Sequence, residues 1–223
     1  MRHAEVDGLR VVLDLGTERY RVLDDVASVL WSVLIGEADA ETTFDRLASE
    51  YALDRDRFGT ELAAFAQRCV SERLLEPAGA PPAATVTPHS AAARGARPGM
   101  LQALTCLIAT RRALRRDGFR ATYESYAALP AGPRTRALHE VLPAFARAEN
   151  FFVARRAPKD CLLRSLALYR FLRTAGVPAH HLLGARRFPF VAHAWVECDG
   201  APVCDERAGG YTPLARIGNV PAP

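Results

Sequence analysis

Apolar residues follow two different periods in the first 76 positions of the chain. Residues 9–14 and 19–23 are rich in β-branched and aromatic side chains, and the turn-rich segment 15–18 between them predicts a hairpin. From residue 25 onward, apolar residues recur every three or four positions, which predicts three amphipathic helices and then a short extended piece at 74–76. The order β-β-α-α-α is typical of a small winged-helix-like domain.

Each predicted helix is preceded by a residue that can cap it. Asp24 precedes the first helix, which runs from residue 25 to residue 35 and is ended by Gly36. The second and third helices each offer two candidate caps. These candidates are Thr42 or Thr43 for the second helix, and Asp54 or Asp56 for the third.

The segment 77–99 lacks apolar periodicity and is rich in Pro, Ala and Gly, which is typical of a linker. It separates a first domain at 1–76 from a second domain at 100–223. Periodic patterns return in the second domain and predict both helices and strands. The helices are expected at 101–116, at 135–147 with a break around Pro143, and from Cys161 to Gly176; the strands are expected at 181–186, 191–198 and 202–205.

The net charge of +4 hides an asymmetry along the chain. Residues 1–80 carry nine arginines against 16 acidic residues, a net charge of −7, whereas residues 81–223 carry a net charge of +11. An acidic winged-helix domain is poorly suited to duplex DNA, because the neutralisation of phosphates requires lysine and arginine. We therefore expect no nucleic-acid partner, and we expect the two domains to have different roles.

Composition and cysteine spacing limit the compartment and the cofactors. No apolar run reaches the roughly 18 residues of a membrane span, and the first seven residues contain no apolar stretch like that of a signal peptide. The five cysteines are scattered and form no C-x-x-C pair, so neither a zinc site nor a disulfide scaffold is expected. These observations predict a soluble protein of the reducing cytoplasm without metal, cofactor or membrane anchor.

A thiol, an imidazole and a carboxylate occur in an order that suits nucleophilic catalysis. Cys161 opens a predicted helix, His193 lies on a predicted strand and Asp205 lies on the next one. The free N–H groups at a helix start stabilise a thiolate. The imidazole is then expected to act as base and the carboxylate to hold the imidazole. The backbone N–H of Cys161 is an expected oxyanion donor, and the sequence identifies no second donor.

The carboxylate can reach His193 only if the connection between the two strands has a suitable length. A two-residue turn places Asp205 on the sheet face opposite His193, whereas a three-residue loop at 199–201 leaves the two on one face. We therefore expect the longer loop or a bulge. Glu206, which suits the short turn, and Asp199 are the competing carboxylates.

The remaining histidines and cysteines are assigned structural or surface positions. The two alanines that flank His193 are expected to leave its imidazole accessible, with Trp195 packed beside it. His180 and His181 are adjacent on a strand, and we expect both at the surface or in a turn. The cysteines expected to serve packing are Cys69, Cys106, Cys198 and Cys204.

Three motifs in the second domain occur in a characteristic order. They are D-C-L-L-R-S-L-A-L at 160–168, G-V-P-A at 176–179 and P-F-V-A-H-A-W-V-E at 189–197. In this combination, the chain closely resembles the lasso peptide biosynthesis leader peptidases, the B proteins of the transglutaminase-like cysteine protease superfamily, over about residues 100–215. The resemblance implies a papain/transglutaminase-like domain with Cys161 as nucleophile on a helix, and with His193 as base and Asp205 as third member on an antiparallel sheet.

The first domain resembles the PqqD-like RiPP recognition elements. The match is carried by the end of the predicted hairpin, Tyr20-Arg21-Val22-Leu23-Asp24. The resemblance implies that a leader peptide adds as a strand to the third β-strand of this fold and packs against its third helix, by β-augmentation. The residues implied in leader binding are Tyr20, Arg21, Val22 and Leu23 on the strand, and Phe58, Leu62 and Phe65 on the helix.

The expected fold class is therefore α+β, with a winged-helix domain followed by a cysteine protease domain. The resemblance implies a leader peptidase whose partners are the precursor peptide and an ATP-dependent, asparagine-synthetase-like lasso cyclase. Two alternatives predict different behaviour. Another acyl-transfer enzyme of this fold, such as a transglutaminase or amidase, would act on substrates without a leader. A non-enzymatic winged-helix regulator would bind DNA and carry an unreactive Cys161.

Overall fold

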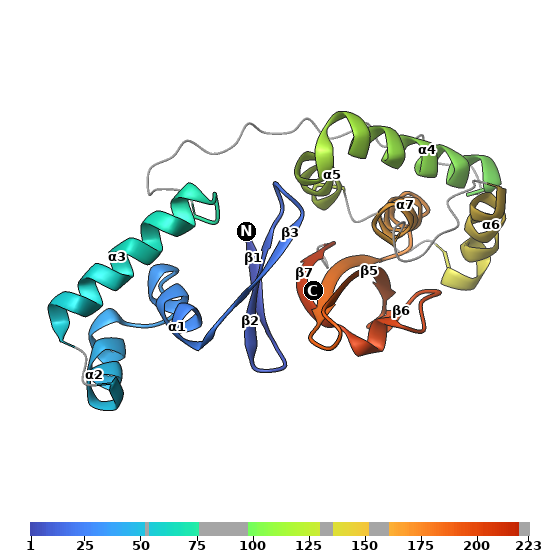
Figure 1. Ribbon diagram of the computed structural model, residues 1–223. Helices are drawn as coiled ribbons and strands as arrows, with labels where there is room; N and C mark the ends of the chain where they lie inside the picture. Colours follow the sequence, from blue (N-terminus) through green and yellow to red (C-terminus); the bar gives the residue numbers. More distant parts are fainter. Residues whose placement is uncertain (52–53, 76–97, 130–135, 152–160, 219–223) are drawn as a thin grey trace. The chain divides into compact units, whose positions relative to one another are not determined.

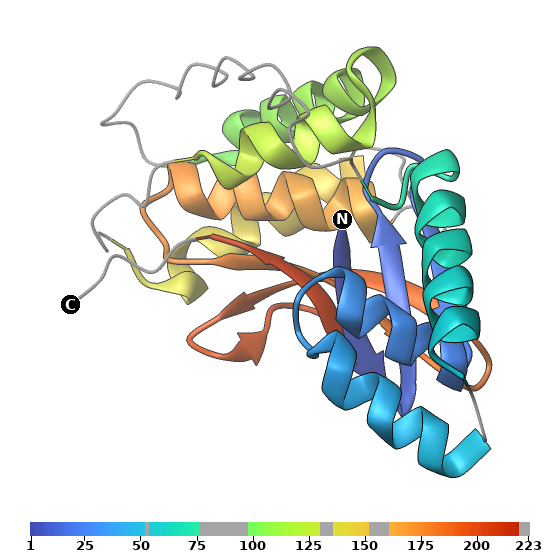
Figure 2. The same cartoon turned by 90° about the vertical axis from the view of Figure 1, so that its left-hand side faces the viewer.

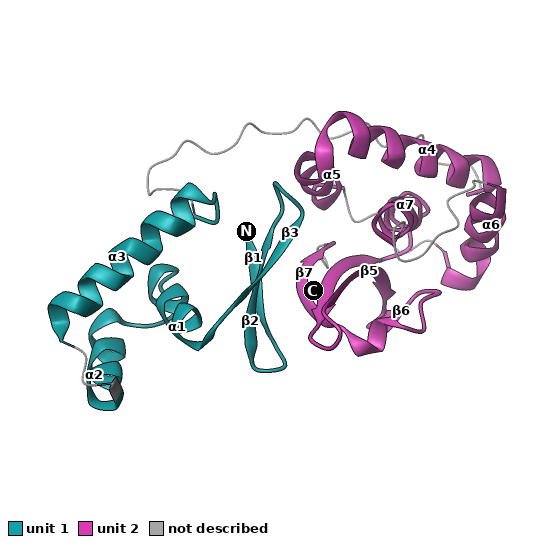
Figure 3. Cartoon of the chain, viewed as in Figure 1, with its two compact units in different colours: residues 1–83 teal, residues 84–223 magenta. Residues whose placement is uncertain are grey.

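A computed structural model describes residues 1–51, 54–75, 98–129, 136–151 and 161–218 of the chain. It divides into two units, Met1–Ala83 and Ala84–Pro223, which Figure 3 colours separately. Only the last two residues of the segment predicted as a linker, 77–99, lie within the described residues. The domain boundaries at 76 and 100 therefore stay a prediction.

The first unit is a three-stranded antiparallel sheet with helices on one of its faces (Figure 1). Its strands are β1 (Arg2–Val6), β2 (Leu9–Asp14) and β3 (Arg19–Leu23), and its helices are α1 (Asp25–Leu34), α2 (Ala40–Tyr51) and α3 (Arg55–Ser71). Strand β1 was not predicted, because its residues are mostly polar and it is held by its ladder with β2. The extended piece predicted at 74–76 is wrong in its described part, where Leu74 instead packs into the core.

Two of the three predicted caps are confirmed. Asp24 accepts a hydrogen bond of 2.7 Å from the backbone N–H of Ala27, and Asp54 caps α3 in the same way. The caps predicted for the second helix are wrong. The backbone N–H of Thr42 donates to Asp39 at 2.8 Å, so this helix begins earlier than its apolar pattern indicates.

The core of the first unit lies between the sheet and the helices. Val12 and Leu23 contribute from the sheet, and Trp31, which is 1% exposed, contributes from α1. Helix α3 adds Phe58, Phe65 and Cys69 to the same core cluster. Burying one such large apolar side chain stabilises the fold by about 1.5–3 kcal/mol. In the strand order β1-β2-β3, β3 is hydrogen-bonded to β2 alone among the described strands, so its other edge is unpaired.

The second unit packs helices on one side of a four-stranded antiparallel sheet of order β6-β5-β4-β7. Figures 1 and 2 show α7 between this sheet and the other helices. The helices are α4 (Met100–Arg116), α5 (Gly118–Ala127), α6 (Leu138–Phe151), α7 (Cys161–Thr174) and the short 3₁₀ helix η1 (Ala208–Gly210). The strands are β4 (His180–Arg186), β5 (Val191–Cys198), β6 (Ala201–Pro202) and β7 (Thr212–Ile217).

The structure adds α5 and β7 to the elements predicted for this unit and corrects one helix. The break predicted around Pro143 is wrong, because α6 runs through this residue while Val141 and Phe145 stay buried on its inner face. Helix α7 is buried on nearly every side beyond its first turn, which is the environment of a central helix rather than an amphipathic surface one. Its position fixes Cys161, its first residue, beside the sheet.

Gly184 is required by the packing of the sheet beneath the candidate site. It pairs with His193 across β4 and β5, and a Cβ atom there would lie 2.6 Å from the backbone oxygen of Thr212 and 2.7 Å from the ring of Trp195. We expect Gly184→Ala to lower the free energy of unfolding by about 1–3 kcal/mol, because neither neighbour can move cheaply. Urea denaturation of the purified protein measures this change.

Gly209 provides the matched control for this prediction. A Cβ built on Gly209 has no atom within 4 Å outside its chain neighbours, so Gly209→Ala should leave the unfolding midpoint nearly unchanged. Equal midpoints for the two variants would contradict the proposed role of Gly184 in packing.

Candidate active site

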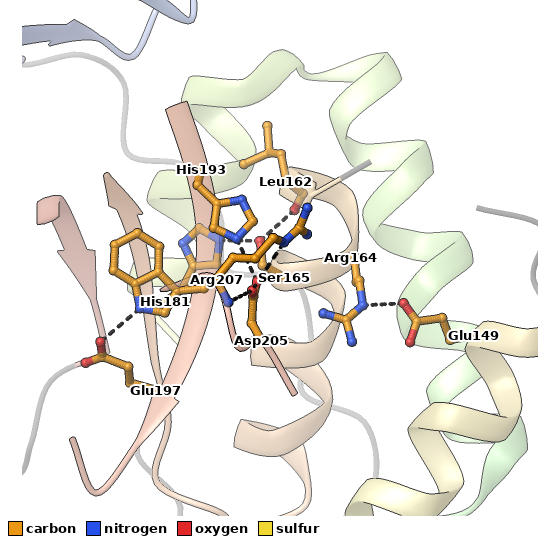
Figure 4. Close-up of polar contacts among 10 residues, drawn as sticks. Glu149, Leu162, Arg164, Ser165, His181, His193, Glu197, Asp205 and Arg207 are labelled. Atoms are coloured by element: carbon orange, nitrogen blue, oxygen red, sulfur yellow. Dashed lines mark hydrogen bonds and ion pairs between the residues drawn. The ribbon is translucent and has the colours of Figure 1, made fainter. Parts of the chain in front are cut away.

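His193 and Asp205 are brought together in the second unit. His193 Nε2–H donates to Asp205 Oδ2 over 2.6 Å, and the two side chains are only 3% and 7% exposed (Figure 4). The prediction of an accessible imidazole is wrong, because aromatic rings cover it. The ring of Trp195 is stacked at 14° with its centroid 6.1 Å away, and the ring of Tyr211 lies 4.8 Å away. The expected packing of Trp195 beside His193 is confirmed.

The backbone route by which Asp205 reaches His193 does not use the predicted longer loop. The three-residue loop at 199–201 is wrong: Cys198 pairs with Ala201, which leaves a two-residue turn whose members both have positive φ. Pairing continues to Val203, whose N–H donates to Val196 over 2.8 Å. At Cys204 the chain adopts φ of +53° and leaves the ladder, which turns Asp205 toward His193. Cys204 is exposed, so its predicted packing role is also wrong.

Both oxygens of the Asp205 carboxylate are engaged. Oδ2 accepts from His193, and Oδ1 accepts from the backbone N–H of Arg207 at 3.1 Å, with Arg207 Nε 3.8 Å away. The competing carboxylates Asp199 and Glu206 are exposed. Within the described residues, Asp205 alone accepts a hydrogen bond from the His193 ring. A carboxylate held at two points fixes both the ring orientation and the proton on Nε2, leaving Nδ1 as the basic nitrogen.

Cys161 is the first residue of α7 and lies beside β5. Burial raises the pKa of its thiol, while hydrogen bonds from the backbone N–H groups of Ala194 and Leu162 act in the opposite direction. Ala194 directly follows His193, so the sulfur lies next to the histidine along β5. In the part of the chain that the structure describes, Sγ makes no hydrogen bond to the imidazole itself. Figure 4 shows the first turn of α7, at Leu162, facing His193 and Asp205.

A second histidine, His181, is buried behind α7 and was assigned wrongly to the surface together with His180. His181 is 0% exposed, and its Nε2 lies 2.9 Å from Ser165 Oγ, one turn along the helix from Cys161. Burial lowers its pKa to about 3, so the ring is uncharged and unsuited to exchanging protons near neutrality. Sequence periodicity gave no signal for this pair, because only the packing of α7 on β4 brings the two residues together.

An ion pair and three of the cysteines contribute to packing. Arg164 pairs with Glu149, which ties α7 to α6. The predicted packing of Cys69, Cys106 and Cys198 is confirmed by their burial, and burial raises the pKa of Cys106 to about 11.

Within the described ranges, no three or more His, Cys, Asp or Glu side chains are grouped to hold a metal ion. None of the helices described has the length and apolarity required to cross a membrane.

The residues predicted to bind a peptide fall into two groups in the first unit. Leu23, Phe58 and Phe65 are core residues with exposures of 8%, 6% and 8%. Val22 is 46% exposed on β3, and Tyr20, Arg21 and Leu62 are partly exposed. Arg21 also forms an ion pair with Glu72 just after α3, at 2.7 Å. The buried residues therefore support the surface, and only the exposed ones can contact a ligand without repacking of the core.

Comparisons with known proteins match the two parts of the chain to two different families. Residues 103–216 match the family model described as transglutaminase-like superfamily, and residues 10–75 match that of coenzyme PQQ synthesis protein D, PqqD. The chain is 44% identical over 46 residues to the microcin J25-processing protein McjB of Escherichia coli. This alignment covers 21% of the chain and 22% of McjB. No solved structure matches the chain.

Proposed function

The chain belongs to the transglutaminase-like superfamily, and from this premise we propose that it is the leader peptidase of a lasso peptide pathway. Its PqqD domain would bind the leader of a ribosomal precursor, and its second unit would hydrolyse the bond between leader and core. The observation that carries the proposal is the buried His193–Asp205 pair, with the thiol of Cys161 held by the amide of the residue next to His193. The local similarity to McjB, a microcin J25-processing protein, supports the same assignment.

The proposed reaction proceeds through a thioester. His193 Nδ1 takes the proton of Cys161 Sγ as the sulfur attacks the carbonyl carbon at the leader–core junction. The backbone N–H of Cys161 stabilises the negative oxygen of the tetrahedral intermediate. The C–N bond breaks, and His193 returns its proton to the departing amine of the core. Water then attacks the thioester with His193 as base, which releases the leader carboxylate and restores the thiol.

The raised pKa of the Cys161 thiol makes a neighbouring base necessary. Because burial favours the protonated thiol, attack requires transfer of its proton, and the amides of Ala194 and Leu162 stabilise the thiolate that results. Hydrogen bonds between nucleophile and base are often long in free enzymes and shorten when substrate binds.

The first unit would capture the leader along the unpaired edge of β3. A peptide strand added there satisfies backbone groups of the edge, and exposed side chains beside it supply specificity. The contact surface proposed is Tyr20, Arg21, Val22 and Leu62, supported from beneath by the buried core. The family resemblance further implies that the free core is handed to an ATP-dependent, asparagine-synthetase-like cyclase. The cysteine pattern of the chain supports a location in the reducing cytoplasm.

Leader dependence distinguishes this proposal from a general amidase or transglutaminase. We expect full-length precursor to be cleaved at least 100-fold more efficiently in kcat/KM than a short peptide spanning the junction alone, because the leader raises the local substrate concentration by about that factor. Mass spectrometry of timed reactions measures both rates. Equal rates would reject the leader-peptidase assignment in favour of the amidase alternative, and DNA binding without cleavage would favour the regulator.

Val22→Asp tests the proposed leader surface. Val22 is 46% exposed on the edge strand, so a charge there should weaken leader binding about ten-fold, near 1.4 kcal/mol, with little effect on folding. Fluorescence anisotropy with a labelled leader peptide measures the affinity. Val26→Asp is the matched control, because Val26 is a 58% exposed valine on a helix whose backbone has no free edge. A similar loss in both variants would argue against binding at β3.

A further inference from the structure

The guanidinium of Arg207 stands beside the His193–Asp205 pair. Its Nε lies 3.8 Å from Asp205 Oδ1, and its side chain is 58% exposed, against 7% for Asp205. Within the described ranges, the Arg207 side chain forms no ion pair other than this one. A guanidinium has five N–H donors, arranged as a fork that matches a carboxylate. Among the contacts of the described residues, the other donors of this exposed side chain therefore remain available to a ligand.

The positioning of Asp205 does not require the Arg207 side chain. The backbone N–H of Arg207 holds Oδ1 at 3.1 Å, and any residue except proline at this position can donate that bond. This backbone hydrogen bond also fixes the position of the Arg207 Cα atom, from which the side chain extends. The backbone thus accounts for the orientation of the carboxylate, and it leaves the exposed cation without a structural role.

The positive charge of Arg207 reaches the nucleophile. Among the described residues, Arg207 is the cation that favours the thiolate of Cys161, in addition to the backbone amides. A second arginine lies close to the pair: the guanidinium carbon of Arg186 is 5.4 Å from the ring centroid of Tyr211, which itself contacts His193. The net charge of +11 on residues 81–223 has the same sign. A substrate that approaches Sγ therefore meets the exposed guanidinium of Arg207, whose charge the buried Asp205 carboxylate partly offsets.

We propose that Arg207 is a specificity-determining residue that binds a carboxylate of the peptide substrate close to the bond attacked by Cys161. The inference rests on the proposed function, since it requires Cys161 to be the nucleophile. The substrate class it names is a peptide with an acidic side chain near the scissile bond. An exposed arginine gives such a carboxylate a charge-assisted and often bidentate contact.

Two alkylating reagents test the proposal without knowledge of the substrate. Iodoacetate and iodoacetamide carry the same reactive carbon, but only iodoacetate is anionic. Rates at Cys161 are followed by mass spectrometry of the peptide that contains it, because Cys204 is also exposed. We expect Arg207→Gln to lower the ratio of the iodoacetate rate to the iodoacetamide rate about three- to five-fold. Arg207→Lys should keep most of the ratio. Added salt should lower the ratio in the unsubstituted protein and in Arg207→Lys, but not in Arg207→Gln.

Arg115→Gln is the control for charge in general. Arg115 is exposed on α4 and is not among the charges that act on the Cys161 thiol, so its loss should leave the ratio unchanged. An unchanged ratio in Arg207→Gln would overturn the proposal, and so would an equal fall in both rates, which would assign Arg207 to activation of the thiol. Failure of Cys161 to react faster than Cys204 would instead count against the proposed function.

Discussion

Replacing Cys161 by alanine is expected to abolish cleavage of the precursor while leaving its leader bound as tightly as before. The substitution removes the only atom proposed to form a bond to the substrate, so the cleavage rate should fall about 10⁴-fold or more. Leader affinity should not change, because the proposed leader surface belongs to β3 and α3 of the first unit, whereas Cys161 begins α7 of the second. Cleavage is measured by mass spectrometry and affinity by anisotropy.

Cys106→Ala is the matched control for the loss of a thiol. Cys106 is buried on α4, and its pKa is raised by burial to about 11, which keeps it protonated and unreactive. We expect this variant to cleave the precursor at close to the normal rate. Cleavage by Cys161→Ala, or equal losses in both variants, would remove the basis of the peptidase proposal.

The second large effect is expected for Asp205→Asn. The amide cannot offer the negative charge that stabilises a protonated His193, and it can turn its NH₂ group toward Nε2, which then must carry no proton. Nδ1 then carries the proton and can no longer accept one from Cys161 as the proposal requires, so kcat should fall about 10²- to 10⁴-fold while KM changes little. Steady-state kinetics with the full-length precursor measures both constants.

Asp199→Asn and Glu206→Gln are the matched controls for this substitution. Both residues are acidic, exposed and within six positions of Asp205 in the sequence, and neither forms a hydrogen bond to His193 among the contacts described. We expect each variant to retain most of its activity. A normal kcat in Asp205→Asn combined with a large loss in either control would show that the orienting carboxylate is a different residue.

Local signals in the sequence were sufficient for most elements of the fold. Apolar periodicity and caps placed α1 and α3, because Asp24 and Asp54 act through bonds to residues three positions away. Periodicity could not find β1, whose polar sequence is ordered by pairing with β2, nor the burial of His181 behind α7. Such features depend on contacts between segments far apart in the chain, and no local pattern encodes them.

In the candidate site, Asp205 shows most clearly which features local sequence predicts and which depend on distant contacts. The residue types and their order were readable, and the identity of Asp205 as the partner of His193 agrees with the geometry. Of the two predicted routes, the three-residue loop was wrong, because the turn has two residues and the chain leaves the ladder at Cys204. Predictions of register assume a regular ladder, and a single residue with positive φ, here Cys204, interrupts the ladder and changes the face on which the next side chain lies.

The sequence by itself determined that a cysteine opens a helix, that a histidine and an aspartate follow on neighbouring extended segments, and that an acidic first part precedes a basic second part. Only the tertiary structure decided that the amide of Ala194 meets the sulfur, that aromatic rings bury His193, and that Arg207 stands beside the carboxylate. The physical reason is that helix starts and strand patterns arise from neighbours in the chain. Hydrogen bonds across the site depend instead on how α7, β5 and the turn after β6 pack together.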